Sequence, residues 1–380
     1  MAKLEFNSNV APTIGVEIEL GIVDAESQLL VSGSNALIER VPTALHSEVK
    51  HELMQCCIEV ISGVCHSVPE AREDLVKKLK AVEQAADAEN LALWWGATHP
   101  FGLWENQDVT DNQRYKNLVL LLQELARRLI TNGLHVHVGV DSGDKAVMIC
   151  DRIMQYLPTL LALSASSPYW QDRDTGLQSH RSKLMEGLPT AGLPTLMRNW
   201  SEYVWLVNHM VETGFINTIR EIWWDVRPHH NFGTVEVRVC DMPGSIDHVC
   251  GLAALMQCLV KYLSDQIDEG TYQFDCHPMM VRQNKWRAAR YGNTARLVNA
   301  RDYRVQSVAE ISLAMVDELR GIAQDLGCEA ELLFVKEIAL GDDWAKQQRE
   351  IFKAMGDDKA KMVKELGKKS RISDPVRAAG

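Results

Sequence analysis

Residues 13–21 read TIGVEIELG, a stretch in which apolar and polar side chains alternate. The apolar side chains share one face of an extended chain, and they are Ile14, Val16, Ile18 and Leu20. Glu17 and Glu19 share the other face, because successive side chains of a strand point in opposite directions. The stretch therefore predicts a strand that buries one face and presents two carboxylates on the other. Taken alone, it also fits any antiparallel strand with one solvated face.

Two later stretches repeat the pattern with other polar groups. The segment LHVHVGV places His135 and His137 opposite an apolar face, and GTVEVRV does the same with Glu236 and Arg238. If the three strands are neighbours in one antiparallel sheet, their polar side chains converge on a concave surface. The repetition therefore predicts a shared site that no single strand would indicate.

A less regular stretch, Glu48–Ile61, adds further carboxylates. Glu59 shares a face with Gln55 and Cys57 and is expected beside the other polar groups. Glu52 is an odd number of residues from Glu59, so a regular strand would place the two on opposite sides. Glu52 joins the site only if the strand starts later or contains a bulge.

Such a cluster predicts a metal site. Four carboxylates this close cannot all stay ionised without a cation, because like charges raise one another's pKa. Oxygen-rich ligation with one or two imidazoles suits magnesium or manganese better than zinc, and magnesium usually binds together with nucleotide phosphates. Simpler interpretations stay open: two half-exposed histidines for His135 and His137, and a cross-strand ion pair for Glu236 and Arg238.

Composition narrows the class of protein. The chain has 380 residues, 46% of them hydrophobic, which is enough for a large core. Its formal net charge of −11 argues against nucleic acid or an anionic membrane as partner. The nine cysteines show no framework spacing, and no signal peptide or membrane-spanning stretch is recognised. We expect a cytoplasmic protein with reduced thiols, a single catalytic domain over residues 1–366 and a flexible tail over 367–380.

Between the strands, the sequence predicts helices and one long loop. Ser67-Val68-Pro69-Glu70 is a capping box that should begin a helix. Further helices are expected over 111–130, over 142–165 with an interruption at Pro158, over 199–213 and through most of the chain after 247. Residues 166–194 are rich in serine, glycine and proline, and they predict a long functional loop.

Missing motifs narrow the chemistry. The chain contains no GxxxxGK[ST], no GxGxxG after a strand, no HExxH and no GxSxG. No cysteine lies among neighbours that would lower its pKa, so a covalent nucleophile is not indicated. The modes of catalysis that remain are the positioning of substrates and the neutralisation of charge by a metal. Phosphoryl transfer needs both.

Several long motifs resemble the glutamate–cysteine ligase type 2 family of bacterial ATP-dependent carboxylate–amine ligases. They occur in order along the chain and are GVEIEL at 15–20, GATHPF at 96–101, NQRY at 112–115, HVHVG at 135–139, SHRSKLMEGLPTAGLP at 179–194, WDVRP at 224–228, GTVEVRV at 233–239 and NKWRAARYG at 284–292. The resemblance implies an α+β fold like that of glutamine synthetase and guanido kinases, with a curved antiparallel sheet and helices on its outer face. It also implies a reaction in which ATP phosphorylates a carboxylate, in the type reaction that of glutamate, and an amine attacks the acyl phosphate.

The resemblance also assigns roles to residues. Metal ligands for Mg²⁺ are implied at Glu17, Glu19, Glu59, His135 or His137, and Glu236. Arginines placed for phosphate or substrate carboxylate are implied at Arg227, Arg238 and Arg290, with Arg287 on the same helix face as Arg290. Arg181 is implied to close over the substrate, and the loop over 166–194 to act as a lid. A solvated helix face remains the alternative for Arg287 and Arg290.

The sequence leaves three alternative functions for this protein. The first is an ATP- and magnesium-dependent ligase of small-molecule amino acid substrates, including glutamate–cysteine ligase activity. The second is a hydrolase that activates water through the HxH histidines and carboxylates. The third is a non-catalytic binder that retains the sheet. Exposed sheet edges and apolar helices are compatible with a homodimer.

Overall fold

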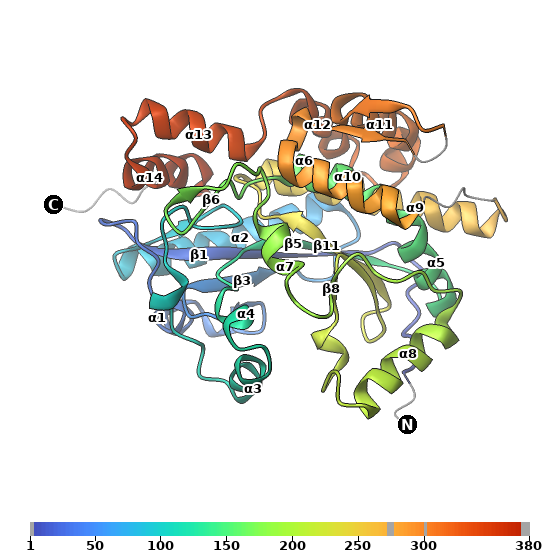
Figure 1. Cartoon of the computed structure of the whole chain (residues 1–380), viewed down its shortest axis with the longest axis horizontal. Coiled ribbons are helices and arrows are strands. Elements are labelled where there is room, and N and C mark those ends of the chain that lie inside the picture. Colours follow the sequence, from blue (N-terminus) through green and yellow to red (C-terminus); the bar gives the residue numbers. More distant parts are fainter. Residues whose placement is uncertain (1–3, 272–276, 300–301, 374–380) are drawn as a thin grey trace.

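The computed structural model describes residues 4–271, 277–299 and 302–373. Within these ranges the centre is a seven-stranded sheet in which all paired strands run antiparallel. Its strands are β1 (Ile14–Asp24), β2 (Val49–His51), β3 (Cys57–Ile61), β4 (Leu91–Trp94), β5 (Gly133–Gly139), β10 (Val226–His229) and β11 (Thr234–Asp241). The order is β10-β11-β5-β1-β3-β2, with β4 also paired to β1. The three alternating strands β11, β5 and β1 are therefore neighbours, as predicted (Figure 1).

Helices surround this sheet. The α-helices of the described ranges are α1 (Ser34–Arg40), α2 (Val68–Ala88), α3 (Gln113–Leu122), α4 (Glu124–Arg127), α5 (Gly143–Ile153), α6 (Leu157–Ser164), α7 (Arg181–Met185), α8 (Trp200–Glu212), α9 (Ile246–Asp268), α10 (Pro278–Tyr291), α11 (Val308–Asp325), α12 (Glu329–Leu340), α13 (Trp344–Ala354) and α14 (Lys359–Ser370). Short strand pairs are β6 (Tyr169–Trp170) with β7 (Arg173–Asp174), β8 (Ala191–Gly192) with β9 (Trp223–Trp224), and β12 (Arg296–Val298) with β13 (Val305–Ser307). The last four helices form a layer along one side of the molecule, and α3 and α8 project on the other (Figure 1).

The main core lies between the apolar sheet face and the helices. The apolar side chains of β1, β5 and β11 are buried there together with those of α2, α5, α6, α9, α11 and α12. Helix α9 is long and apolar enough in composition to cross a membrane, but 78% of its most apolar window is buried inside the protein. This is the burial expected of a core helix, and the α+β prediction with helices against one face of an antiparallel sheet is confirmed.

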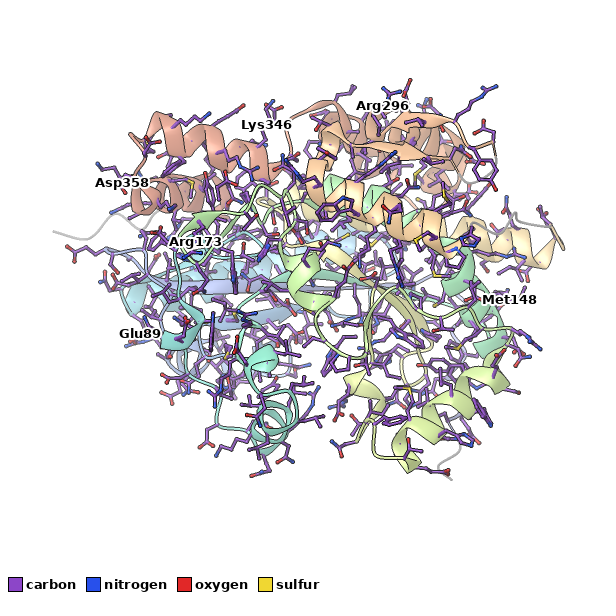
Figure 2. All side chains as sticks on the ribbon, viewed as in Figure 1. Glu89, Met148, Arg173, Arg296, Lys346 and Asp358 are labelled. Atoms are coloured by element: carbon purple, nitrogen blue, oxygen red, sulfur yellow. The ribbon has the colours of Figure 1, made fainter. Side chains whose placement is uncertain are left out.

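Helix α2 begins at the capping residue that the sequence predicts. Ser67 caps α2 by accepting a hydrogen bond from the backbone N–H of Glu70, and proline stands in the first turn. On the outer side of the C-terminal helical layer, charged side chains such as Arg296 and Lys346 are exposed (Figure 2). The eight cysteines in the described part of the chain are all free and buried.

Two expected elements differ from the structure. The single helix expected over 111–130 is broken at Gln123, whose φ of 53° lies in the left-handed region, so α3 and α4 are separate. The long loop over 166–194 is not structureless, since it contains β6, β7, α7 and β8. Period-based reasoning missed these short pieces because they are held by tertiary contacts.

The tail expected over 367–380 starts too early. Helix α14 runs through the first four of these residues, and Arg371 forms an ion pair with Asp87. The backbone amides of the next two residues donate to the carboxylate of Glu83. Contacts with α2 therefore order the first part of a segment of polar composition, and of the expected tail only 374–380 lies outside the described residues.

Gly233 provides a test of the turn between β10 and β11. Its φ is +63°, and a Cβ at this position would overlap the carbonyl oxygen of Asn7. We expect Gly233→Ala to lower the free energy of unfolding by about 1–3 kcal/mol, because alanine is strained in this conformation and meets backbone atoms. Urea denaturation measures the change, and Gly270→Ala, also at positive φ but with open space around its Cβ, isolates the contribution of the overlap.

Candidate active site

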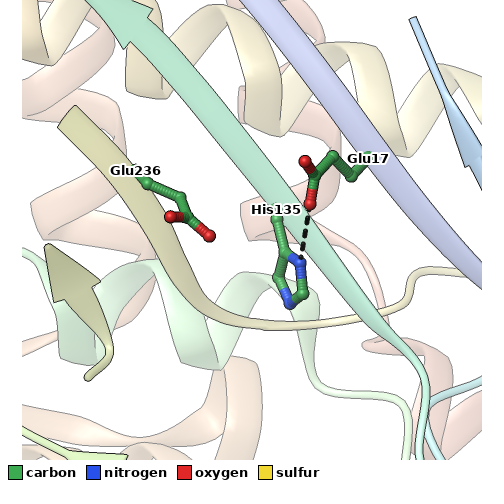
Figure 3. Close-up of side chains that lie close together, drawn as sticks. All are labelled: Glu17, His135 and Glu236. Carbon is green, nitrogen blue, oxygen red and sulfur yellow. Dashed lines mark hydrogen bonds and ion pairs between the residues drawn. The ribbon is translucent and has the colours of Figure 1, made fainter. Parts of the chain in front are cut away.

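Three neighbouring strands bring Glu17, His135 and Glu236 together. In the sheet register, Glu17 of β1 is paired with His135 of β5, and His137 of β5 is paired with Glu236 of β11. One ligand atom from each of Glu17, His135 and Glu236 lies within 4.8 Å of the others (Figure 3). The apolar side chains that alternate with these residues are buried in the core, so the packing of the opposite face fixes which side chains enter the site.

The two histidines have different surroundings. Nδ1 of His135 lies 3.3 Å from a Glu17 oxygen, and its Nε2 is buried without a hydrogen-bond partner in the described chain. Burial and the charge of Arg238 lower the pKa of His135, so its imidazole is neutral. With Nδ1–H donating to Glu17, Nε2 carries a free lone pair, as a metal ligand must.

His137 instead lies between a hydroxyl group and two carboxylates. Its Nδ1 lies 3.0 Å from the hydroxyl of Thr234, and its Nε2 lies 3.3 Å from Glu17. Although burial opposes the charged form, Glu236 and Glu17 raise the pKa of His137. Of the two candidate imidazoles, His135 therefore belongs to the ligand cluster, and His137 lies beside it as a charge partner of Glu17.

A second cluster lies next to the first along β1. Glu19 is paired directly with Glu59 of β3, and Glu52 joins them with one oxygen of each within 4.8 Å. Glu52 reaches this side because β2 ends at His51 and β3 begins only at Cys57, which is the late strand start that the sequence left open. The chain between the two strands is a turn, so the strand parity that separated Glu52 from Glu59 does not apply.

Two arginines surround Glu236. Arg227 contacts it through Nε at 2.7 Å and Nη2 at 3.2 Å, and Arg238 forms a second ion pair. Burial raises the pKa of Glu236, but these two guanidinium groups outweigh it and hold the pKa well below its usual range. Nη1 of Arg227 also donates to the carbonyl of Ile222, so this arginine is bound on three sides. In this structure Arg227 orients Glu236.

Arg181 of the 166–194 segment lies over the end of β5. Its side chain is buried, and its Nε has no hydrogen-bond partner in the described chain. A Cβ at position 133 would overlap Nη2 of Arg181 and lie 3.0 Å from Nε2 of His135. Arg181 therefore lies beside the first cluster, and its closure over a substrate stays a prediction.

The remaining two arginines, Arg287 and Arg290, form hydrogen bonds with backbone carbonyls. Arg290 donates to the carbonyl of Gly176, and Arg287 to that of Arg296 at 3.0 Å. Within the described ranges neither has a recorded contact with the sheet carboxylates. Helix α10 instead buries Lys285, a residue of the same motif that periodicity did not single out.

Lys285 connects two segments near the site. Its Nζ lies 2.6 Å from Asp225 and 2.8 Å from Glu186, and the side chain is 2% exposed. Asp225 precedes β10 and accepts the backbone N–H of Arg238 through its carbonyl. Lys285 thus ties the segment containing α7 to the strand that carries Glu236.

The clusters fit divalent cations. Burial and the neighbouring charge of Glu19 raise the pKa of Glu52 to about 8, and burial with Glu52 raises that of Glu59 well above its usual value. These carboxyl groups hold protons at neutral pH because their negative charges would repel one another, and a bound cation can replace the protons in neutralising that charge. The orphaned Nε2 of His135 and the oxygen-rich second cluster match the ligands of magnesium or manganese.

This arrangement predicts how pH affects the metal-free protein. Glu52 has a raised pKa in the folded state, so between about pH 4.5 and pH 8 the unfolded chain binds fewer protons than the folded one. The contribution of protonated Glu52 to the free energy of unfolding is therefore fully present below pH 4.5 and is lost as the pH rises through 8. We expect Mg²⁺ to raise the melting temperature more at pH 8 than at pH 6, because fewer protons must be displaced. Thermal denaturation with EDTA or Mg²⁺ measures this, and Glu52→Gln should reduce the difference.

Comparison with known proteins agrees with this geometry. Residues 13–365 match the model of the family described as glutamate–cysteine ligase family 2 (GCS2). A relative from Frankia casuarinae, named "Putative glutamate--cysteine ligase 2-1", is 39% identical over 98% of this chain and 99% of its own length. One from Thermobifida fusca, named "Putative glutamate--cysteine ligase 2", is 38% identical over 99% of this chain and 98% of its own.

Solved structures share the fold at low sequence identity. The glutamate–cysteine ligase of Francisella tularensis, crystallised in complex with AMP, superposes with a TM-score of 0.73 at 13% identity, covering 98% of this chain and 91% of that one. A bifunctional glutathione synthetase from Pasteurella multocida superposes with a TM-score of 0.69 at 14% identity, covering 95% of this chain and 52% of that one. The match of the family model over nearly the whole chain places the protein: it belongs to glutamate–cysteine ligase family 2 and is an ATP-dependent carboxylate–amine ligase.

Proposed function

We propose that this enzyme joins the γ-carboxylate of glutamate to the amino group of cysteine, and that Mg²⁺ or Mn²⁺ is held at the two clusters. The observation that carries the metal proposal is the pair of adjacent ligand sets on one sheet face. The free Nε2 of His135 lies 4.0 Å from Glu19 of the second set, so His135 stands between the two. The names of the curated relatives support the choice of glutamate and cysteine.

The first cluster would bind its cation through Glu17, His135 and Glu236, and the second through Glu19, Glu52 and Glu59. Magnesium-bound ATP would supply the phosphoryl group that converts the substrate carboxylate into an acyl phosphate, while the metal neutralises phosphate charge.

The protein's own residues prepare this site. Hydrogen bonds from His135 and His137 outweigh burial and lower the pKa of Glu17, so its carboxylate is ionised and oriented before ligands bind. Arg227 and Arg238 do the same for Glu236. Because these charges are fixed by the fold, little reorganisation is needed when phosphate charge develops in the transition state.

Arg181 and the segment over 166–194 have a second role in this proposal. A guanidinium with an unpartnered Nε suits a planar anion, so Arg181 would contact a substrate carboxylate or a phosphoryl group. Ordered chain above the sheet would keep water from the acyl phosphate. Membership in a ligase family argues against the hydrolase alternative.

A substrate panel tests the assignment. The protein is supplied with ATP, Mg²⁺ and each pair of one amino acid carboxylate with one amine, and release of ADP and phosphate is measured. We expect glutamate with cysteine to exceed other pairs, and EDTA to abolish turnover. A different preferred pair would overturn the substrate assignment and leave the ligase class intact.

A further inference from the structure

Asp241 is a buried carboxylate whose position depends on an irregularity in β11. The register between β11 and β5 shifts between Val237 and Cys240. Glu236 and Asp241 are an odd number of residues apart, so a regular strand would place them on opposite faces. The bulge restores Asp241 to the face of Glu236, because it is paired with Gly133 of β5 as Glu236 is paired with His137.

The carboxylate of Asp241 accepts hydrogen bonds from two separate parts of the 166–194 segment. It accepts hydrogen bonds from the backbone N–H of Ser166 at 3.0 Å, the hydroxyl of Ser167 at 2.6 Å and the hydroxyl of Ser179 at 2.9 Å. The Asp241 side chain is completely buried. It therefore ties the beginning of the 166–194 segment to the residues just before α7.

These contacts lead directly to Arg181. The hydroxyl of Ser167, which donates to Asp241, also accepts the backbone N–H of Arg181 at 3.0 Å. The backbone N–H of His180, the residue before Arg181, donates to the carbonyl of Ser167. The guanidinium of Arg181 then lies against Gly133, the residue paired with Asp241. Arg181 also supplies favourable charge to Asp241, which limits the rise in the pKa of this carboxyl that burial causes.

We propose that Asp241 is a positioning residue: through Ser167 and Ser179 it places Arg181 over the end of β5, where the guanidinium faces an anionic oxygen pair of the substrate carboxylate or of ATP. This inference rests on the proposed role of Arg181 in the ligase reaction. Neither the apolar alternation of β11 nor the arginine itself identifies Asp241, because only the bulge brings it to this face.

A double-mutant cycle tests the proposal. We expect Asp241→Asn to lower kcat/KM for ADP formation by roughly 10- to 100-fold, as loss of a charged hydrogen-bond acceptor would. In an Arg181→Ala background the same change should lower kcat/KM by less than about twofold, because the group on which Asp241 acts is absent. Equal factors in the two backgrounds would overturn the proposal. A raised KM for the amino acid carboxylate identifies that group as the ligand of Arg181, and a raised KM for ATP identifies a phosphoryl group.

Two further variants separate positioning from stability. Glu83→Gln is the matched control, because Glu83 is a buried carboxylate that also accepts three hydrogen bonds, from the backbone of Ile372 and from the backbone and hydroxyl of Ser373. It should change the melting temperature without changing kcat/KM. Gly133→Ala leaves Asp241 intact but displaces the guanidinium of Arg181 and also crowds Nε2 of His135, so it should lower kcat/KM at least as much as Asp241→Asn.

Hydrogen exchange gives a readout that does not depend on turnover. Residues 166–181 should exchange faster in Asp241→Asn than in the wild type and should be unchanged in Glu83→Gln. If the wild type fails to form ADP from glutamate and cysteine, the substrate assignment fails, while exchange still reports on Asp241. Unaltered exchange of this segment in Asp241→Asn would overturn the positioning role itself.

Discussion

Glu17→Gln is expected to lower kcat by at least about 100-fold while the protein stays folded. Glu17 contacts both His135 and His137, and one of its oxygens belongs to the first ligand cluster. Glutamine has nearly the same shape but no charge, so it would weaken cation binding and remove the anion that orients His135. ADP release at saturating ATP and amino acids measures kcat, and Mg²⁺ titration measures the affinity for the cation.

The control for this variant is Glu83→Gln, a carboxamide substitution of a buried carboxylate in α2 whose hydrogen-bond partners are Ile372 and Ser373. It should retain wild-type kcat. If Glu17→Gln kept full activity and metal affinity, Glu17 would not be a ligand. The first cluster would then lose its place in the mechanism.

Glu236→Ala is expected to lower the free energy of unfolding by about 3–5 kcal/mol. The side chain of Glu236 is 1% exposed and pairs with Arg227 and Arg238, whose side chains are 11% and 15% exposed. Removing the shared carboxylate leaves two largely buried positive charges without their partner, and an uncompensated buried charge is strongly destabilising. Urea denaturation in EDTA measures the change without any contribution from bound metal.

Exposed Glu39 provides the comparison, since Glu39→Ala should change the unfolding free energy by no more than about 0.5 kcal/mol. A similarly small change for Glu236→Ala would mean that Arg227 and Arg238 find water or other acceptors when the carboxylate is removed. In that case Glu236 would contribute to ligand binding but not to the stability of the sheet.

Much of the site was predictable from sequence because strand alternation is a local rule. Once Ile14 and Val16 are assigned to the core, the pleat places Glu17 on the opposite face whatever the rest of the chain does. The same rule placed His135 and Glu236, and the structure brings these three residues together. The motifs for α2 and its capping Ser67 are local in the same sense.

Other assignments needed contacts between distant segments. The choice of His135 over His137 depends on their neighbours from other strands. Nε2 lacks a hydrogen-bond partner in both rings, and it is His135 that forms the ligand group with Glu17 and Glu236. Arg287 and Arg290 have a helix spacing that suits a binding face, yet their partners are backbone carbonyls of other segments. Periodicity shows which residues share a face of a helix or strand, but it does not show which other segments contact that face.

The sequence alone determined the alternating strands, their buried faces and the carboxylates and imidazoles on the other faces, because side-chain direction in a regular strand follows from chain geometry. That these strands are neighbours in one antiparallel sheet was a condition in the sequence analysis, and the structure met it. Tertiary structure decided the membership of Glu52 and Asp241, since a late strand start and a bulge each interrupt the period of two. It also decided the pairing of Glu236 with Arg227 and Arg238. The physical reason is that alternation holds only where the ladder is regular, and these residues lie where it breaks or depend on neighbours from other segments.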